Sequence, residues 1–246
     1  GMFAFVLWDN RSQILFLARD RMGIKPLYYL KTDQFFFFAS NPQALLKTGV
    51  CDTSIDPVSL HHLFTLHAVV PAPGTLFNGV KKCPPAHTMK FDKSGSLIFS
   101  RYWQLIAKRP KTPKSDAQWR EEIHQSLLQA VKKRLAIADV PVGVLLSGGL
   151  DSSLLVALLA EAGVPDIKTF SIGFEDQPEE KGNEFEYSDP VAEMYKTDHH
   201  KFLIPNAEVL QRLPEAVGSM AEPMFGQDAV AFYLLSERVS KSVKVV

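Results

Sequence analysis

The run Val142-Gly-Val-Leu-Leu-Ser-Gly-Gly-Leu-Asp-Ser-Ser153 reads as a buried strand, a glycine turn and the start of a helix in immediate succession. Residues 142–146 are a short apolar run, which is typical of a strand buried on both faces of a parallel sheet. Gly148 and Gly149 then allow the backbone to turn sharply and to come close to a ligand. The Leu- and Ala-rich residues after Asp151 predict a helix. This order of elements is typical of a phosphate-binding site.

The first turn of this predicted helix is where we expect phosphate to bind. Its backbone N–H groups lack intrahelical acceptors and carry the positive end of the helix dipole, so they attract anions. The hydroxyl groups of Ser147, Ser152 and Ser153 add hydrogen-bond donors. The loop is not a Walker-type P-loop, because no lysine follows the glycines, and it is not a G-x-G-x-x-G dinucleotide fingerprint.

Asp151 indicates which kind of phosphate site this loop would form. A carboxylate in the first turn of a helix can be an ordinary helix cap. Beside bound phosphates, however, a bare carboxylate would repel them unless Mg²⁺ lay between, since this ion is held by one or two carboxylates together with phosphate oxygens. The residues leave both interpretations open, and the functional one predicts Mg²⁺ at Asp151.

The two halves of the sequence differ in texture. Before about Tyr102, short runs of aromatic and β-branched residues alternate with turn residues, which predicts antiparallel strands. From Trp119 onward, helical periodicity alternates with apolar runs, which predicts helices packed on a parallel sheet. The predicted strands include residues 3–7, 14–17, 35–38, 202–204 and 242–246, and the predicted helices include residues 57–66 and 228–238.

Composition argues against several other classes of protein. Lysine plus arginine and aspartate plus glutamate number 27 each, so no overall positive charge favours nucleic acid as a partner. No apolar run is long enough to span a membrane, and the N-terminus lacks a signal-peptide pattern. The two cysteines, Cys51 and Cys83, are too few for a disulfide framework, so the expected compartment is the cytoplasm.

Several motifs resemble one enzyme family and follow one another in that family's order. Residues 147–153 resemble the pyrophosphate loop of the ATP pyrophosphatases, which split ATP between the α and β phosphates. Residues 19–29 and 84–87 resemble the glutaminase half of the glutamine-hydrolysing asparagine synthetases, and residues 169–174 and 198–200 resemble their synthetase half. Several motifs in the right order are far more specific than the loop alone.

The resemblance implies two incomplete domains. Residues 1–103 would form the C-terminal portion of a class II glutamine amidotransferase domain, an α+β sandwich of the Ntn type. Residues 104–118 would be a linker. Residues 119–246 would form the N-terminal portion of an ATP-dependent synthetase domain, an α/β parallel-sheet fold similar to the adenine nucleotide α-hydrolases.

The resemblance also implies site residues. Asp20 would hold the α-ammonium group of glutamine, a task that suits a carboxylate, although a turn aspartate also fits its position. Leu146 and Ile172 would line the nucleotide pocket, and a role as apolar core at the strand ends is compatible with the same place. The full ATP-binding set would be Leu146, Ser147, Gly148, Gly149, Leu150, Asp151, Ser152, Ser153, Ile172 and Gly173.

In enzymes that this chain resembles, the glutaminase nucleophile is a cysteine at the start of the mature chain, whose α-amine can serve as the base. The sequence begins Gly1-Met2-Phe3, so we expect no catalytic residue of the glutaminase among its residues. In the family a second glycine-rich phosphate motif and a catalytic lysine follow the counterpart of residues 243–246. We therefore expect this sequence to be an internal part of a longer enzyme and to be inactive alone, with exposed sheet edges that favour self-association into homo-oligomers.

The expected reaction is ATP-dependent amide formation on a small carboxylate acceptor, with glutamine as the source of ammonia. Within the family, the closest resemblance is to the N-acetylglutaminylglutamine amidotransferases, carried by residues 54–62, 67–73, 184–189, 220–224 and 228–235. Ordinary asparagine synthetases tend to read D-E-P where this chain has Ala221-Glu222-Pro223. A dipeptide is thus the preferred acceptor and aspartate the first alternative. A non-catalytic nucleotide-binding or assembly module is the alternative from another class.

Overall fold

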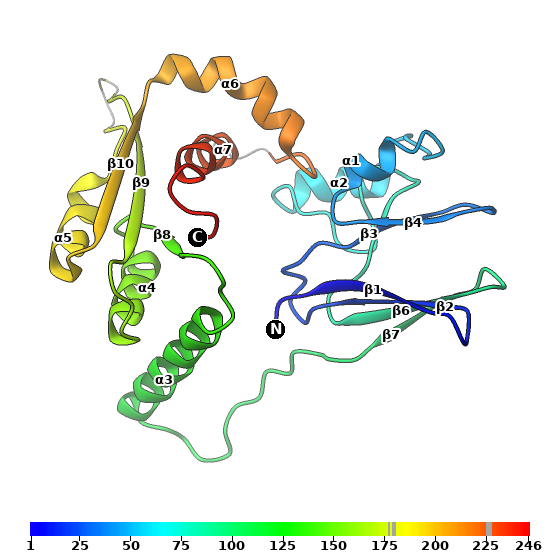
Figure 1. Ribbon diagram of the computed structural model, residues 1–246, viewed down its shortest axis with the longest axis horizontal. Helices are drawn as coiled ribbons and strands as arrows, with labels where there is room; N and C mark the ends of the chain where they lie inside the picture. The colour runs from blue at the N-terminus through cyan, green and yellow to red at the C-terminus, as the bar shows by residue number, and fades with distance from the viewer. Residues whose placement is uncertain (177, 179–180, 225–227) are drawn as a thin grey trace. The chain divides into compact units, whose positions relative to one another are not determined.

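The computed structural model describes residues 1–176, 178, 181–224 and 228–246, and it divides into two units (Figure 1). The first unit comprises residues Gly1–Lys108 together with the described part of Ser219–Phe225. The second comprises Arg109–Gly218 and the described residues that follow position 227. A short piece of the second half of the sequence therefore belongs to the first unit.

Two antiparallel sheets and two short helices make up the first unit. The four-stranded sheet has the order β1-β2-β6-β7, with β1 at Ala4–Asp9, β2 at Ile14–Arg19, β6 at His87–Asp92 and β7 at Leu97–Arg101. The three-stranded sheet has the order β4-β3-β5, with β3 at Tyr28–Lys31, β4 at Phe36–Ala39 and β5 at Lys81–Lys82. Helices α1 (Pro42–Leu46) and α2 (Pro57–Thr65) lie between β4 and β5 in the chain.

The core of the first unit lies between its two sheets. One buried cluster draws residues from both of them: Leu17, Leu27, Tyr29, Cys83 and Met89. Strand β1 shows the alternation that places side chains there, because Ala4 and Val6 pack against this cluster while Phe5 and Leu7 are exposed on the opposite face. The strands predicted at 3–7, 14–17 and 35–38 are confirmed.

Asp56 defines the start of α2, where the sequence predicts a helix. Its side chain accepts hydrogen bonds from the backbone N–H groups of Val58 (2.9 Å) and Ser59 (3.0 Å), and Pro57 occupies the first helical position. Both features are ordinary helix-start chemistry. The predicted helix at 57–66 is confirmed.

A three-stranded parallel sheet organises the second unit. Its order is β10-β9-β8, with β8 at Gly143–Leu145, β9 at Lys168–Phe174 and β10 at Asp198–Ile204. The helices are α3 (Asp116–Leu135), α4 (Leu150–Glu161), α5 (Phe185–Tyr195), α6 (Asn206–Ser219) and α7 (Asp228–Val239). Strands and helices alternate along the chain, so the predicted mixed α/β architecture with a parallel sheet is confirmed.

Helices cover both faces of this sheet (Figure 1). On one face α3, α4 and α5 contribute Leu128, Val156 and Ala192 to a cluster that includes Val144 of β8. On the other face, α6 and α7 pack against the side chains of β9 and β10. None of the helices in the described part of the chain is both long and apolar enough to cross a membrane.

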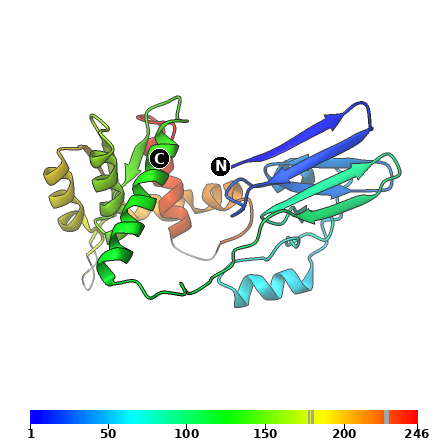
Figure 2. The same ribbon diagram turned by 90° about the horizontal axis from the view of Figure 1, so that it is seen from below.

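Two predicted boundaries differ from the structure. The connection from β7 to α3 contains neither helix nor strand until Ser115, and α3 then begins at Asp116, so the last three residues of the expected linker 104–118 are helical (Figure 2). The strand predicted at 242–246 is reduced to a single parallel bridge between Val142 and Val245. Only one backbone hydrogen bond, from the Gly143 N–H to the Val245 carbonyl (2.9 Å), supports this bridge.

Candidate functional site

The turn that follows β8 is shaped by the packing of α5 as well as by its own glycines. Gly148 has a φ of +84°, in the left-handed region that glycine adopts without strain. A Cβ atom at this position would lie 2.4 Å from the Cβ of Tyr187 and 2.7 Å from the backbone N of Ser188. Gly148 is therefore required both by its backbone conformation and by the close approach of the first turn of α5.

Gly149 faces a different environment. Gly149 is the N-cap residue of α4, so no side chain caps the start of this helix. A Cβ atom built on Gly149 would meet only the Ser147 Oγ, at 3.3 Å. The first backbone bond of the helix runs from the Ser153 N–H to the Gly149 carbonyl (3.1 Å). The N–H groups of Leu150, Asp151 and Ser152 precede this bond and have no intrahelical acceptor. The start of α4 thus presents free N–H groups with open space in front of Gly149, the arrangement that binds anions in other proteins.

Three serines lie in the turn before α4 or in the first turn of the helix. Ser147 Oγ lies 3.1 Å from Ser152 Oγ and accepts a hydrogen bond from the Gly149 N–H (3.3 Å). Ser153 Oγ is buried and has no hydrogen-bond partner among the described residues. An unsatisfied buried hydroxyl costs about 1–3 kcal/mol, so a ligand oxygen that pairs with it would be bound favourably.

Asp151 is the second residue of α4, and the N-cap position belongs to Gly149. The carboxylate is exposed, and among the described residues no hydrogen bond or ion pair engages it. Asp151 therefore does not cap α4 as its N-cap residue, although a carboxylate in the first turn also suits the helix dipole. A free carboxylate beside an anion site fits a bridging cation.

Strand β9 brings its end next to this loop. The Leu146 N–H donates to the Phe170 carbonyl (2.8 Å), and the Ser171 hydroxyl donates to the Leu146 carbonyl. Leu146 is only 1 % exposed, and Ile172 packs against the clusters formed with α6 and α7. These two side chains contribute to the core at the carboxyl ends of the strands, which is where ligands bind in open parallel sheets.

Gly173 is covered rather than open. A Cβ at this position would lie 2.4 Å from the Cβ of Asn183 and 2.9 Å from the ring of Phe185. The segment that leads into α5 thus crosses directly over the end of β9. The sequence gives no signal that α5 and the residues before it pack on both Gly148 and Gly173. The contact with Gly148 joins segments about 40 positions apart, and the contact with Gly173 depends on the path of an irregular connection.

Asp20 organises the turn between β2 and β3. Its Oδ1 accepts hydrogen bonds from the N–H groups of Met22 (3.1 Å) and Ile24 (3.0 Å), and its Oδ2 accepts from those of Lys25 (2.9 Å) and Phe3 (3.3 Å). Burial by itself raises the pKa of Asp20, but these four backbone donors outweigh it and hold the pKa below its ordinary value. A carboxylate offers about four acceptor positions, so these four N–H groups engage all of them.

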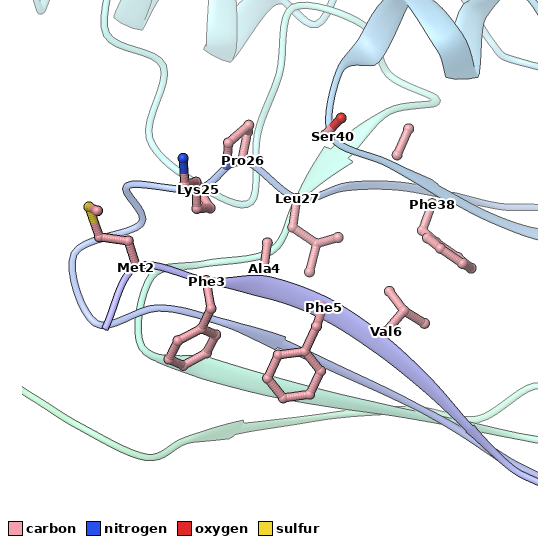
Figure 3. A pocket seen from close by; sticks show the side chains of 11 residues that line it. Met2, Phe3, Ala4, Phe5, Val6, Lys25, Pro26, Leu27, Phe38 and Ser40 are labelled. Carbon is pink, nitrogen blue, oxygen red and sulfur yellow. The ribbon is translucent and has the colours of Figure 1, made fainter. Parts of the chain in front are cut away.

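An open pocket of about 660 Å³ lies beside this turn (Figure 3). Strand β1 contributes Ala4 and Val6, which point toward Leu27, while Lys25 and Ser40 lie at its polar rim. Phe3, whose N–H binds Asp20, also lines this pocket, so the Asp20 turn supports one of its walls.

Comparisons with known proteins bear on both units. Residues 122–246 match the family described as asparagine synthase, and residues 1–103 match the glutamine amidotransferase domain. Asparagine synthetase [glutamine-hydrolyzing] 3 of Bacillus subtilis is 34 % identical over 232 residues, which cover 88 % of this chain and 36 % of the relative. Asparagine synthetase 1 of the same organism is 31 % identical over 245 residues, which cover 100 % of this chain and 37 % of the relative.

A third relative is the putative asparagine synthetase 2 of Methanocaldococcus jannaschii, which is 31 % identical over 250 residues that cover 100 % of this chain and 47 % of the relative. The chain thus spans less than half the length of each of these relatives. The match extends through both units, and the order of the two matched regions is the order that the motifs predict. The chain belongs to the asparagine synthase family and carries a glutamine amidotransferase domain ahead of the synthase region.

Proposed function

We propose that this chain is part of a ligase that uses ATP and glutamine to convert an acceptor carboxylate into an amide. Glutamine hydrolysis yields glutamate and ammonia, ATP transfers its AMP group to the acceptor carboxylate with loss of pyrophosphate, and ammonia then displaces AMP to form the amide. Adenylation is needed because a free carboxylate is a poor electrophile and has no good leaving group. Membership of the asparagine synthase family supports this chemistry.

The observation that carries the proposal is the open start of α4. The free N–H groups of its first turn, the hydroxyl groups around it and the space in front of Gly149 suit a pyrophosphate group. Ser153 supplies a buried hydroxyl whose hydrogen-bonding capacity the described residues leave unused. We assign Leu146 and residues 147–153 to the ATP site.

Mg²⁺ fits this site through Asp151. The ion would be held by this one exposed carboxylate together with phosphate oxygens, which is a common arrangement for Mg²⁺. When bound, it would neutralise charge on the pyrophosphate leaving group. The contribution of the protein is to keep the Asp151 carboxylate free of other partners and to hold it at the helix start.

We assign the adenosine side of ATP to the end of β9. Ile172 would present an apolar surface to the nucleotide, and the close packing of residues 183–185 over Gly173 would fix the neighbouring backbone. Because backbone N–H groups of its own turn and of Phe3 use all acceptor positions of Asp20, we propose that Asp20 acts on glutamine by shaping the wall of the adjacent pocket.

The preferred acceptor is the dipeptide N-acetylglutaminylglutamine, and aspartate is the alternative. The support for the dipeptide is the likeness of residues 184–189 and 220–224 to that branch, where alanine replaces the first residue of D-E-P. The relatives named above are asparagine synthetases, which favours aspartate. We propose a cytoplasmic location, where the two free cysteines would stay reduced.

The test is an amide-forming assay of the full-length enzyme with each acceptor, in which amide, AMP and pyrophosphate are measured together. We expect equal amounts of the three products with the dipeptide and little amide with aspartate. Asp151→Asn, which keeps the shape and removes the charge, should abolish pyrophosphate release, whereas Asp139→Asn, an exposed control, should not. Pyrophosphate release that survives Asp151→Asn would refute the assignment of the ATP site, and amide from aspartate alone would refute the dipeptide.

A further inference from the structure

The segment from Ser219 to residue 224 lies between α6 and α7 in the chain, yet it belongs to the first unit. Three side chains of that unit hold it. Tyr28 on β3 and Lys82 on β5 bind the Glu222 carboxylate, and Gln43 on α1 donates a hydrogen bond to the Met220 carbonyl. We call the contacts among Tyr28, Lys82 and Glu222 the Glu222 latch.

The Glu222 latch is a compact and largely buried ion pair. Lys82 Nζ lies 2.8 Å from Glu222 Oε1 and 2.9 Å from Oε2, and it also donates to the Val70 carbonyl (2.7 Å). The Tyr28 hydroxyl donates to Glu222 Oε1 (3.0 Å). The side chains of Lys82 and Glu222 are only 13 % and 17 % exposed. Loss of the Lys82 charge would leave the Glu222 carboxylate poorly solvated and without an ion-pair partner, and loss of the Glu222 charge would do the same to Lys82.

Sheet register explains why two side chains reach one carboxylate. Tyr28 and Lys82 are directly paired residues of the antiparallel strands β3 and β5, so their side chains project from the same face of the sheet. Burial first, and then the negative charge of Glu222, raises the pKa of Tyr28, which keeps its hydroxyl protonated as a donor. The two paired strands β3 and β5 therefore supply both groups that bind the Glu222 carboxylate.

The helices on either side of the segment that carries Glu222, α6 and α7, pack near the proposed ATP site. Ala216 of α6, together with Val230 and Leu234 of α7, packs in one cluster with Ile172 of β9. These helices flank the segment that carries Glu222 and are covalently continuous with it through the chain. The segment that carries Glu222 is thus joined through the chain to helices that pack against Ile172 at the end of β9.

We propose that Glu222 is a positioning residue that couples the two half-reactions, because the Glu222 latch ties the α6–α7 connection of the synthetase half to the glutaminase half. This proposal rests on the function proposed above. An intact latch makes ammonia release respond to ATP and acceptor at the synthetase site. A broken latch leaves each half-reaction active but lets glutamine be hydrolysed without matching amide formation.

The test uses the full-length enzyme with Lys82→Met, which removes the charge and keeps the aliphatic stem. Lys81→Met is the matched control, since Lys81 is the neighbouring residue of β5 and makes no ion pair among the described contacts. Three rates are measured: glutamate release from glutamine alone, pyrophosphate release with ammonium, and the ratio of glutamate to pyrophosphate with glutamine, ATP and acceptor together.

For Lys82→Met we expect both separate rates to stay close to wild type and the ratio of glutamate to pyrophosphate to rise about tenfold, within the usual range of coupling between sites. Lys81→Met should keep the wild-type ratio. Tyr28→Phe, which removes a single hydroxyl, should change the ratio in the same direction by less. Glu222→Gln combined with Lys82→Met should raise the ratio no further than Lys82→Met alone, because both changes break the same contact.

An unchanged ratio in both Lys82→Met and Tyr28→Phe, with both separate rates intact, would overturn the coupling role. If Lys82→Met fails to fold, Tyr28→Phe and hydrogen exchange of the backbone amides at 219–222 decide: faster exchange with a raised ratio supports the Glu222 latch, and either one unchanged rejects it. A wild-type enzyme that forms no amide from any acceptor would instead refute the proposed function itself.

Discussion

Gly148 and Gly149 are adjacent in the sequence but are constrained by different parts of the structure. Gly148 combines a left-handed backbone with close contact to Tyr187, whereas the space in front of Gly149 is open apart from Ser147 Oγ. Both glycines allow a sharp turn, but only the second leaves room for a ligand. Their roles can therefore be separated by substitution.

We expect Gly148→Ala to lower the free energy of unfolding by about 2–5 kcal/mol, from the left-handed conformation and the overlap with α5 together. Gly149→Ala should cost about 1 kcal/mol or less, the loss expected for alanine at an N-cap. Urea unfolding of the two variants measures the difference. An equal loss of unfolding free energy in the two variants would contradict the close packing of α5 against Gly148.

The free energy of unfolding should depend on pH through Asp20, and the sign of this dependence follows from the lowered pKa of the Asp20 carboxyl group. A group with a lowered pKa in the folded state stabilises the protein above its unfolded pKa, and this contribution is lost as the pH falls through the folded value. Asp20→Asn should therefore lower the free energy of unfolding by about 1–3 kcal/mol at pH 7, because backbone donors lose their charged acceptor.

The difference in unfolding free energy between wild type and Asp20→Asn should shrink as the pH falls below the ordinary aspartate value of 3.8. Denaturant unfolding at a series of pH values gives this difference directly. Asp52→Asn is a suitable comparison, because Asp52 binds Ser54 in an exposed turn and its loss should matter less. A difference that stays constant down to low pH would contradict the role assigned to the Asp20 hydrogen bonds.

At the scale of elements, α3 shows how local chemistry sets a helix boundary. Ser115 Oγ accepts from the Gln118 N–H (3.3 Å) and the Gln118 side chain accepts from the Ser115 N–H (2.9 Å), a complete capping box. This pair explains why the helix begins at Asp116, ahead of the expected end of the linker. The S-x-x-Q pattern was present in the sequence as a signal for that boundary.

Ser115→Ala should destabilise the protein by about 0.5–2 kcal/mol, the usual cost of losing an N-cap side chain. Ser126→Ala is the matched control, since Ser126 is exposed in the middle of the same helix, where alanine is the better helix former. Thermal unfolding followed by circular dichroism compares the two. A Ser126→Ala variant less stable than Ser115→Ala would contradict the capping role.

At the scale of the whole molecule, the two units predict two separable half-reactions. In the full-length enzyme, Asp20→Ala should sharply raise the glutamine concentration needed for amide formation and spare synthesis driven by added ammonium, because Asp20 lies in the first unit. Asp151→Ala should abolish pyrophosphate release with either source of nitrogen, because Asp151 lies in the second. Steady-state assays with glutamine and with ammonium distinguish them.

Equal loss with both nitrogen sources in Asp20→Ala would contradict this separation of roles. So would rescue of Asp151→Ala by ammonium, because ammonium replaces glutamine and not ATP. Lys25→Ala, at the polar rim of the pocket beside Asp20, offers a comparison in which the turn itself is left in place. It should affect the glutamine requirement less than Asp20→Ala, since Lys25 binds Asp20 through its backbone N–H.

The parallel sheet, its alternating helices and the glycine turn before α4 could be predicted from the sequence because each depends on neighbouring residues. Apolar runs, helix periodicity and paired glycines act through backbone geometry within a few positions. The segment 242–246 shows the limit, because its apolar run also suits a strand and it forms only one bridge. Whether such a run becomes a strand depends on the partner that folding brings beside it.

The sequence alone was therefore sufficient for the family, for the change from antiparallel strands to alternating strands and helices, and for the strand, turn and helix around residues 142–153. Only the tertiary structure decided two contacts: the close packing of α5 against Gly148, and the binding of Glu222 by Lys82 and Tyr28. The physical reason is distance along the chain. Local hydrogen bonding and side-chain periodicity produce a recognisable pattern in the sequence. A contact between residues 140 positions apart produces no such pattern, because it forms only when the chain folds and brings the two residues together.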